Sequence, residues 1–356
     1  MKTIIKVLMI SLIATVLSLC KKNIENNVTI PDINFLDALI NLGVDKNSDG
    51  IISTGEAAEV TSLDVRDHSI GDLKGIEAFI NLGTLYCDQN HLISLDLSHN
   101  KELQTLTCWI NRLKSLNISQ NPYLKRLECP YNKLTGLDVS NNPALTFLEC
   151  EWNSIANLDV SNNPELNILY CDGNSLTSLD LSNNHRLTTL DCCYNSFTNL
   201  DLSNNPALIY FMSWDNPLNN LDVSNNPALK GIDCRDGSLT SLDLSHSPAL
   251  ESLNCSGNSL TSLDLSHSPA LESLNCSGNS LTSLDVMNNP ALIYLFCEGN
   301  LLTSFDVSGN FALEYLLLGS MPGLTKVCVW TIPFPPARVT VDTTGSPNVY
   351  FTMECN

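Results

Sequence analysis

The chain has few basic residues: Lys and Arg number 18 against 38 Asp and Glu, which gives the 356 residues a formal charge of −20. Nucleic acids and anionic membrane surfaces are bound through basic patches, so this shortage argues against both classes of partner. Beyond its first twenty residues the chain lacks an apolar run long enough to cross a bilayer. It has no GxSxG, HExxH or phosphate-loop motif, and its six histidines stand apart from any paired nucleophile. These absences predict that the protein is not an enzyme, and the charge favours cationic partners or metal ions.

Residues 1–20 have the composition of an export signal. A basic start precedes an apolar run that is too short for a membrane span and that ends in Leu-Ser-Leu-Cys. This ending resembles a bacterial lipobox, in which Cys20 becomes the lipidated first residue of the mature chain. Leu19 departs from the small residue usual at that position, and a conventional signal peptide is the alternative. We expect residues 21–34 to be a tether and a lipid on Cys20 to be the one membrane attachment.

A motif with a period of 21 residues fills most of the chain. Its first half matches the leucine-rich-repeat consensus LxxLxLxxN/CxL, as in residues 82–92, and its second half reads LxxLDLSxNP. The pattern predicts a leucine-rich-repeat solenoid over residues 63–327, with one 22-residue unit, eleven 21-residue units and a partial unit. Alternating Leu, Asp and Leu in the second half predicts extended chain instead of helix, hence a strand-rich fold. Residues 328–356 are expected to form a carboxy-terminal cap.

Two inward columns recur with the repeat. Cysteine returns every 21 residues, with Ser213 as the one gap, at Cys87, Cys108, Cys129, Cys150, Cys171, Cys192, Cys234, Cys255, Cys276 and Cys297. An asparagine follows three residues after each position except at Gly237, and should hydrogen-bond backbone groups as a ladder. Parallel side chains roughly 4.8 Å apart suit neither disulfides nor a tetrahedral zinc site, so the cysteines are expected to be buried apolar filler. Cys193 falls one place later and should face out as a free thiol, whereas Cys328 and Cys355 are a candidate disulfide.

An aspartate column, interrupted only at Asn117, runs through the second halves of the units. Its members are Asp96, Asp138, Asp159, Asp180, Asp201, Asp222, Asp243, Asp264, Asp285 and Asp306. Ionised neighbours at the strand spacing repel by about 1 kcal/mol even in water, so the column needs donors or cations. Serine stands two residues after this position in ten of eleven units, which favours a hydrogen-bonded structural row. A row of bound cations is the alternative.

Aromatic residues gather at the outward positions of the first strand and in the two residues after it. Such residues are typical of binding hot spots and also suit sugar rings, although aromatic residues favour strands in any case. We predict a ligand surface on the concave face at Tyr86, Trp109, Tyr131, Trp152, Tyr170, Tyr194, Tyr210 and Trp214, with Tyr294 and Phe296 beyond. Residues 238–258 recur letter for letter at 259–279. Calling each turn of the coil a rung, we interpret these two rungs as spacers because their outward side chains are small and polar.

Residues 45–56 match the twelve-residue EF-hand calcium loop. Calcium takes about six to eight oxygen ligands. The predicted ligands are Asp45, Asn47, Asp49, Ile51 through its carbonyl, Ser53 and Glu56. An acidic turn without metal is the alternative. Apolar residues before the loop indicate an entering helix, so residues 35–62 are expected to form a small helical, EF-hand-like cap that one Ca2+ orders.

The export signal, the candidate lipidated cysteine, the EF-hand-like loop and the 21-residue Cys/Asn/Asp repeats together resemble the exported leucine-rich-repeat lipoproteins of Gram-negative bacteria. The resemblance covers nearly the whole chain. It implies a protein at the outer membrane or cell surface, or else a secreted one, that binds a protein or glycan ligand, as in adhesion. We expect a monomer. A structural surface spacer or adhesin scaffold is the alternative, and a hydrolase that uses the concave carboxylates is a weaker one.

Overall fold

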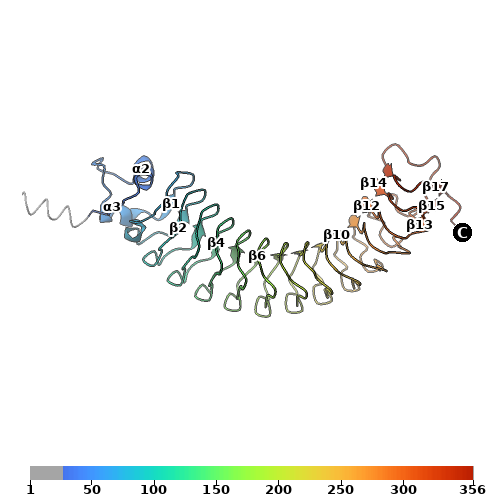
Figure 1. Ribbon diagram of the computed structural model, residues 1–356, viewed down its shortest axis with the longest axis horizontal. Coiled ribbons are helices and arrows are strands. Elements are labelled where there is room, and N and C mark those ends of the chain that lie inside the picture. Colours follow the sequence, from blue (N-terminus) through green and yellow to red (C-terminus); the bar gives the residue numbers. More distant parts are fainter. Residues whose placement is uncertain (1–26, 356) are drawn as a thin grey trace, which may run out of the picture. The chain divides into compact units, whose positions relative to one another are not determined.

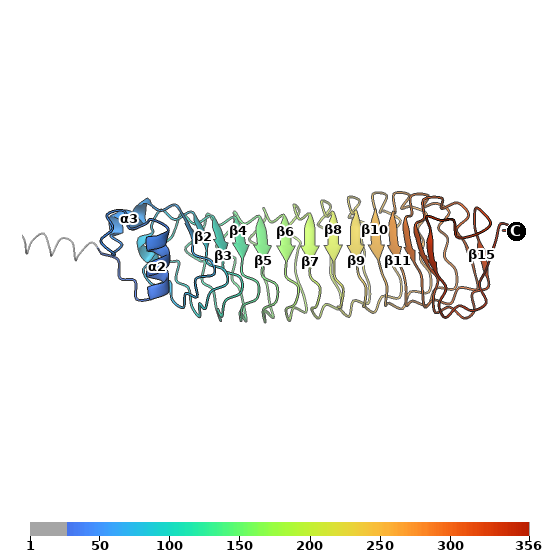
Figure 2. The same ribbon diagram turned by 90° about the horizontal axis from the view of Figure 1, so that it is seen from above.

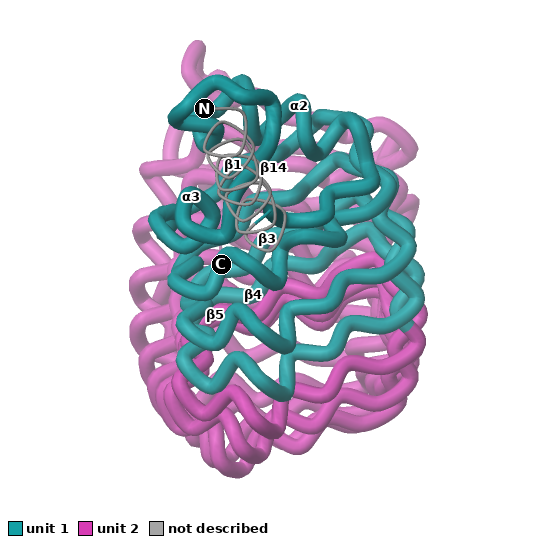
Figure 3. Tube along the Cα trace, turned by 90° about the vertical axis from the view of Figure 1, so that its left-hand side faces the viewer, with its two compact units in different colours: residues 1–134 teal, residues 135–356 magenta. Residues whose placement is uncertain are grey.

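The computed structural model describes residues 27–355, so the signal region and Cys20 lie outside the described residues. The chain divides into two compact units, unit 1 ending at Leu134 and unit 2 beginning at Thr135 (Figure 3). In each unit the chain coils so that short strands stack in parallel. The helices of the described residues are α2 (Ile33–Asn41), α3 (Thr54–Glu59) and the 3-10 helix η1 (Ile76–Ala78). The predicted strand-rich leucine-rich-repeat solenoid with few helices is therefore confirmed.

Unit 1 contains the helical cap and the first four strands. These strands are β1 (Ser62–Asp64), β2 (Thr84–Tyr86), β3 (Thr105–Thr107) and β4 (Arg126–Glu128). Leu63 lies opposite Leu85, 22 residues on, and Leu85 lies opposite Leu106, 21 residues on, as the unit lengths predict. The central leucine of each strand is buried while its two neighbours are more exposed. This alternation is the period of two that any strand imposes on its side chains.

Unit 2 continues the same pattern through a longer sheet. Its strands, in order, are β5 (Phe147–Glu149), β6 (Ile168–Tyr170), β7 (Thr189–Asp191), β8 (Tyr210–Met212), β9 (Gly231–Asp233), β10 (Ser252–Asn254), β11 (Ser273–Asn275), β12 (Tyr294–Phe296), β14 (Tyr315–Leu317) and β16 (Thr340–Asp342). Figure 2 shows several of these strands side by side. Within unit 2 the sheet lines the concave side of the coil (Figure 1), so the first and third residues of each strand face the hollow.

The second half of each rung is extended, as predicted, but it forms regular strands only near the carboxyl end. There β13 (Ser304–Asp306), β15 (Lys326–Cys328) and β17 (Tyr350–Thr352) pair in parallel. Elsewhere in the described residues, isolated bridges join only Asp96 with Asn117 and Asp222 with Asp243 among these segments. Because β16 and β17 each add a strand to a sheet, the coil continues beyond the predicted boundary at residue 327.

The cysteine column is buried as predicted, with every member at most 3% exposed and every thiol free. Burial raises the pKa of these thiols, so they stay neutral. Cys193 is a free thiol as predicted, but the expected exposure is wrong, because its side chain is only 1% exposed. The same position on the adjoining rungs carries Asp172 and Trp214, and the Cys193 thiol hydrogen-bonds to the Asp191 side chain and to the Trp214 backbone. Facing away from the core is therefore not the same as facing water.

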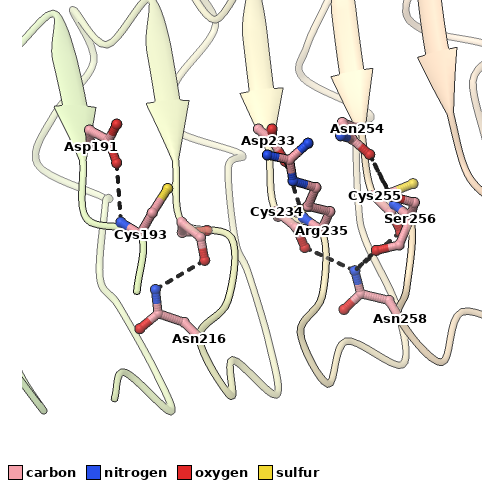
Figure 4. A network of polar contacts seen from close by, with 11 residues as sticks. Asp191, Cys193, Asn216, Asp233, Cys234, Arg235, Asn254, Cys255, Ser256 and Asn258 are labelled. Carbon is pink, nitrogen blue, oxygen red and sulfur yellow. Dashed lines mark hydrogen bonds and ion pairs between the residues drawn. The ribbon is translucent and has the colours of Figure 1, made fainter. Parts of the chain in front are cut away.

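The asparagine ladder is present as predicted. The Asn195 Nδ2 donates to the Cys171 carbonyl at 3.0 Å and to the Cys192 carbonyl at 3.1 Å, while its Oδ1 accepts from the Leu176 N–H at 2.9 Å. Figure 4 shows the equivalent contacts of Asn216 and Asn258. Each side chain thus serves its own rung and the preceding one, which couples neighbouring repeats.

A second asparagine ladder was missed in the sequence. It is fully buried and comprises Asn100, Asn121, Asn142, Asn163, Asn184, Asn205, Asn226, Asn289 and Asn310. The Asn184 Nδ2, for example, donates to the Val160 carbonyl at 3.1 Å and to the Asn163 carbonyl at 2.9 Å. The sequence offered one signal for this ladder, the asparagine of the recurring Asn-Pro pair. An exposed turn accepts several residue types, so the repeated use of asparagine pointed to a specific contact. In the duplicated rungs Ser247 and Ser268 replace it.

Candidate functional site

Three aromatic side chains meet on unit 2, and we call Trp152, Tyr194 and Trp214 the aromatic cluster. The ring centroids of Trp152 and Tyr194 lie 5.5 Å apart, and those of Tyr194 and Trp214 lie 4.1 Å apart. Trp152 is 43% exposed and Tyr194 is 37% exposed. Packed aromatic rings that stay accessible in the turns after the strands are the composition of an interaction hot spot.

A glycine permits the first of these contacts. Trp152 and Tyr194 are two rungs apart, and Gly173 occupies the same position on the rung between them. A Cβ on Gly173 would lie 2.8 Å from Trp152 Cδ2, which is too close for two carbon atoms. The missing side chain therefore lets the indole lie across the intervening rung. All three residues have a positive φ, which glycine adopts most easily.

Four carboxyl groups lie beside the aromatic cluster, and we call Glu149, Glu151, Asp172 and Asp191 the acid group. Burial, followed by repulsion from Asp172 and Glu149, raises the pKa of Glu151 to about 8. Burial, followed by repulsion from Asp191, raises the pKa of Asp172 to about 6. Both shifts have the sign expected where negative charges crowd together in a partly desolvated place. The acid group favours a positively charged ligand.

A cation already occupies one side of the aromatic cluster. The guanidinium of Arg235 lies 4.3 Å from the centre of the Trp214 ring, and its Nε lies 3.7 Å from Asp233 Oδ1. A guanidinium over an indole is a favourable cation–π contact. The same surface can therefore hold a basic side chain against an aromatic face next to a carboxylate.

Of the remaining predicted ligand residues, Tyr86, Trp109 and Tyr131 belong to unit 1, and Tyr170 and Tyr210 belong to unit 2. Tyr86 lies under the Arg66 guanidinium in unit 1, at 5.1 Å from the ring centre. Trp109 is half-buried in the same unit, where Tyr131 is exposed. In unit 2, Tyr170 and Tyr210 line a separate groove.

The EF-hand-like loop lies between α2 and α3 in the helix–loop–helix order predicted. Asp32 caps α2 by accepting from the Asn34 and Phe35 N–H groups, and it also accepts from the Gly71 N–H at 2.7 Å. The same carboxylate thus begins the helix and ties the cap to the first rung. Phe35 of this helix also packs against Phe79, with ring centroids 6.4 Å apart. The helix begins at Ile33, two residues before the predicted start of the cap.

The loop's own oxygens are turned inward. Asp45 Oδ2 accepts from the Gly50 N–H at 2.8 Å, and Asp49 Oδ1 accepts from the Ile51 N–H at 2.9 Å. Glu56 accepts from the Lys46 N–H at 2.9 Å and from the Ser53 N–H at 2.8 Å, which lowers its pKa. Gly50 has a φ of 78°, as the bend requires. Carboxylate, amide, hydroxyl and carbonyl oxygens are hard ligands, so the donor set fits calcium.

The exposed aspartate column is held by its own turns. Asp180 Oδ1 accepts from the Ser182 N–H at 2.9 Å, and the hydroxyl and N–H of Ser182 lower the pKa of Asp180. The same bond recurs at the other column positions, for example between Asp264 and the Ser266 N–H. These bonds run within one rung and not between rungs. The serine donors predicted from the sequence therefore do bond to the aspartates, within local turns of the same rung.

At the carboxyl end, Asp306, Cys328 and Cys355 each offer a ligand atom within 4.8 Å of the others, the one such group of three carboxyl, imidazole or thiol ligands among residues 27–355. The two thiols are free and share a hydrogen bond. Burial, together with that bond, raises the pKa of Cys328 to about 11. The predicted disulfide between Cys328 and Cys355 stays a prediction, and the short distance permits it.

Comparison with known proteins identifies the repeat independently. Residues 248–289 match the family model described as leucine-rich repeats in two copies. The functional domain of InlJ from Listeria monocytogenes, whose structure includes a cysteine ladder, is 34% identical; the match covers 78% of this chain and 70% of that one, with a TM-score of 0.56. An internalin, InlF, of the same species is 19% identical over 92% of this chain and 96% of its own, with a TM-score of 0.75.

A third similar structure, the LRIM1/APL1C complex, is 22% identical over 75% of this chain and 53% of that one, with a TM-score of 0.65. No curated protein matches the chain. Over residues 27–355, every helix falls short of the length and apolar character needed to cross a membrane.

Proposed function

We propose a function from the family of this chain, which belongs to the leucine-rich-repeat proteins of the bacterial internalin type. The protein is a non-catalytic surface protein that binds a basic segment of a partner protein. A solved protein with the same solenoid, LRIM1, is found in complex with a protein partner, APL1C. The contact would be made by the aromatic cluster and the acid group on the concave side of unit 2. The observation that carries the proposal is the placement of exposed indole and phenol rings beside crowded carboxyl groups.

Both parts of this surface select for a cation. A lysine or arginine that binds beside crowded carboxylates stabilises them, because its positive charge offsets their mutual repulsion. The aromatic rings attract the same groups through their faces, as Arg235 already demonstrates on Trp214. A chain with a net charge of −20 also steers cationic partners toward itself at low ionic strength.

Replacing Trp152, Tyr194 and Trp214 together by alanine is expected to weaken binding of a labelled lysine-rich peptide at least about tenfold, or 1.4 kcal/mol. Fluorescence anisotropy measures the change, with a glutamate-rich peptide of equal length as the negative probe. Tyr123→Ala removes an exposed aromatic side chain outside the cluster and should leave the affinity unchanged. Equal binding by the triple variant and the wild type would instead favour the structural spacer.

The affinity for the lysine-rich peptide is expected to rise as the pH goes from about 5 to about 8. Because the pKa of Glu151 is raised to about 8, this group is mostly protonated at pH 7, and a bound cation favours its ionised form. Binding should therefore release protons, which calorimetry in buffers of different ionisation enthalpy measures. Glu151→Gln should remove most of the release, whereas Asp180→Asn, whose carboxyl has a lowered pKa, should not. An affinity independent of pH would contradict the role of the acid group.

We also propose that Cys20 carries a lipid that holds the protein at the outer membrane or cell surface, and that Cys328 and Cys355 pair after export. The apolar run that ends at Cys20 supports the first proposal, and the proximity of the two thiols supports the second. The intact mass of the protein isolated from its native membrane tests both. Cleavage before Cys20 with added acyl chains and the loss of two hydrogens are the expected result. An unmodified Cys20, or two alkylatable thiols, would contradict the respective proposal.

One calcium ion in the loop of residues 45–56 is the cofactor we propose. It would be held by Asp45, Asn47, Asp49, the Ile51 carbonyl, Ser53 and Glu56. These residues follow α2 directly, and Asp32 joins α2 to the first rung. Ordering the loop would therefore stabilise the whole cap, which shields the end of the coil from water.

A further inference from the structure

A groove of about 730 Å³ opens on the concave sheet of unit 2, over strands β9 to β11. This volume is in the range of small-ligand sites. Its walls are aromatic and thioether side chains, namely Tyr210 and Met212 on β8 and Phe296 on β12. It is separate from the aromatic cluster, none of whose members lines it. Its floor includes the duplicated rungs that their sequence marked as spacers.

Small side chains create the hollow. The first residues of β9, β10 and β11 are Gly231, Ser252 and Ser273, whereas β8 and β12 carry tyrosines at that position. A Cβ on Gly231 would lie 3.0 Å from Tyr210 Cδ1, so this ring leans over the glycine. The rungs whose small polar side chains suggested a spacer therefore form the recess between two aromatic walls.

The floor also presents two equivalent donors. Asn254 and Asn275 end β10 and β11, at the position where β7 and β9 carry aspartates. Asn254 Oδ1 accepts from the Ser256 N–H at 3.3 Å (Figure 4), and Asn275 Oδ1 accepts from the Ser277 N–H at 3.1 Å. Among the described residues neither Nδ2 has an acceptor, so two amide donors of fixed orientation face the groove about one strand spacing, roughly 4.8 Å, apart.

The charges of the groove are balanced by neighbours. The Lys230 ammonium lies 2.8 Å from Glu251 Oε1, and Asp233 is close to the Arg235 guanidinium. No free cation remains among these residues to hold a sulfate, a carboxylate or a phosphate. An uncharged ligand with many oxygens suits this lining better than an anionic one.

We propose that this groove binds a neutral oligosaccharide, whose apolar ring faces stack on Tyr210 and Phe296 while its oxygens accept from Asn254 and Asn275. An aromatic ring attracts the C–H face of a sugar, and amide donors match hydroxyl and ring oxygens. The equal donors on successive rungs suit a polymer that repeats its chemistry. An extended peptide fits less well, because its side chains on one face recur at roughly 6.8 Å instead of 4.8 Å.

The test is calorimetric titration of the full mature chain with cellohexaose, chitohexaose and maltohexaose. At least one of them should bind, and Asn254→Ala/Asn275→Ala should weaken that binding at least about tenfold, as should Phe296→Ala. Asn141→Ala/Asn204→Ala, which removes two exposed asparagines outside the groove, should change it less than twofold. Circular dichroism of each variant checks that the coil is intact.

Two results would overturn the proposal. The first is that none of the three sugars binds at about 10 mM, and the second is that the groove variants bind as well as the wild type. The site is independent of the proposed protein contact, so the aromatic-cluster variant should keep its sugar affinity. If instead the wild type binds no sugar and the groove variants lose the lysine-rich peptide, the groove belongs to the protein-binding surface.

Discussion

Replacing Asn195 by alanine is expected to lower the free energy of unfolding by about 3 kcal/mol. The side chain is buried, and its bonds reach the Cys171 and Cys192 carbonyls and the Leu176 N–H. Each buried polar group left without its partner costs about 1–3 kcal/mol, and the site is too buried for water to replace all the lost bonds. Denaturant titration followed by circular dichroism measures the loss. Hydrogen exchange at the Leu176 amide should accelerate first, because this N–H loses its acceptor.

Asn199 provides a matched control four residues away. Its side chain is exposed, and its Nδ2 donates only a long hydrogen bond of 3.5 Å to Thr198 Oγ1. Asn199→Ala should change the stability by less than about 0.5 kcal/mol. If the two variants are equally stable, the asparagine ladder contributes nothing beyond filling space. Because repeats touch only their neighbours, the damage from Asn195→Ala should centre on the rungs from residue 171 to 197.

Glu56→Gln is expected to remove calcium-dependent stabilisation of the amino-terminal cap. Calcium at a hundred times its dissociation constant adds about 2.7 kcal/mol to a state that binds it when folded and not when unfolded. Glutamine cannot supply the bidentate carboxylate of the twelfth loop position. It can still bond the Ser53 N–H in the capping box that begins α3, so the helix itself is spared. The melting temperature with calcium and with chelator measures the effect.

Glu59→Gln is the control for this experiment. Glu59 ends α3 outside the predicted ligand set and pairs with Lys46 on the exposed surface. Exposed ion pairs contribute at most about 1 kcal/mol, so this variant should keep the full response to calcium. A wild-type protein that melts at one temperature with and without chelator would exclude an ordering role for the metal.

The candidate site could be read from the sequence in part. Trp152, Tyr194 and Trp214 were predicted to face the ligand, because strand alternation and the repeat period settle which residues point away from the core. Their contact could not be predicted. It depends on Gly173, which removes a side chain from between two rungs, and therefore on stacking in three dimensions. The predicted exposure of Cys193 was wrong for the same reason, since an outward side chain can still be buried among its neighbours.

The duplicated rungs are a second case in which the sequence did not reveal a feature of the surface. Residues 238–279 contain no aromatic residue, and in sequence they suggest a spacer. In the structure their small side chains form the floor of a groove because Tyr210 and Phe296 rise on either side. A recess forms where the side chains of one rung are smaller than those of the neighbouring rungs. The sequence of a single rung therefore does not reveal it.

The sequence by itself determined the coil: the 21-residue period, the buried leucine and cysteine columns and the asparagine ladder. These features are set within one rung and its copy, by side-chain alternation and by the backbone groups that each turn must satisfy. Only the tertiary structure decided which outward residues meet, which are covered and where the sheet is hollowed. Those outcomes depend on the sizes of side chains stacked roughly 4.8 Å apart on successive rungs, a relation that no single repeat specifies.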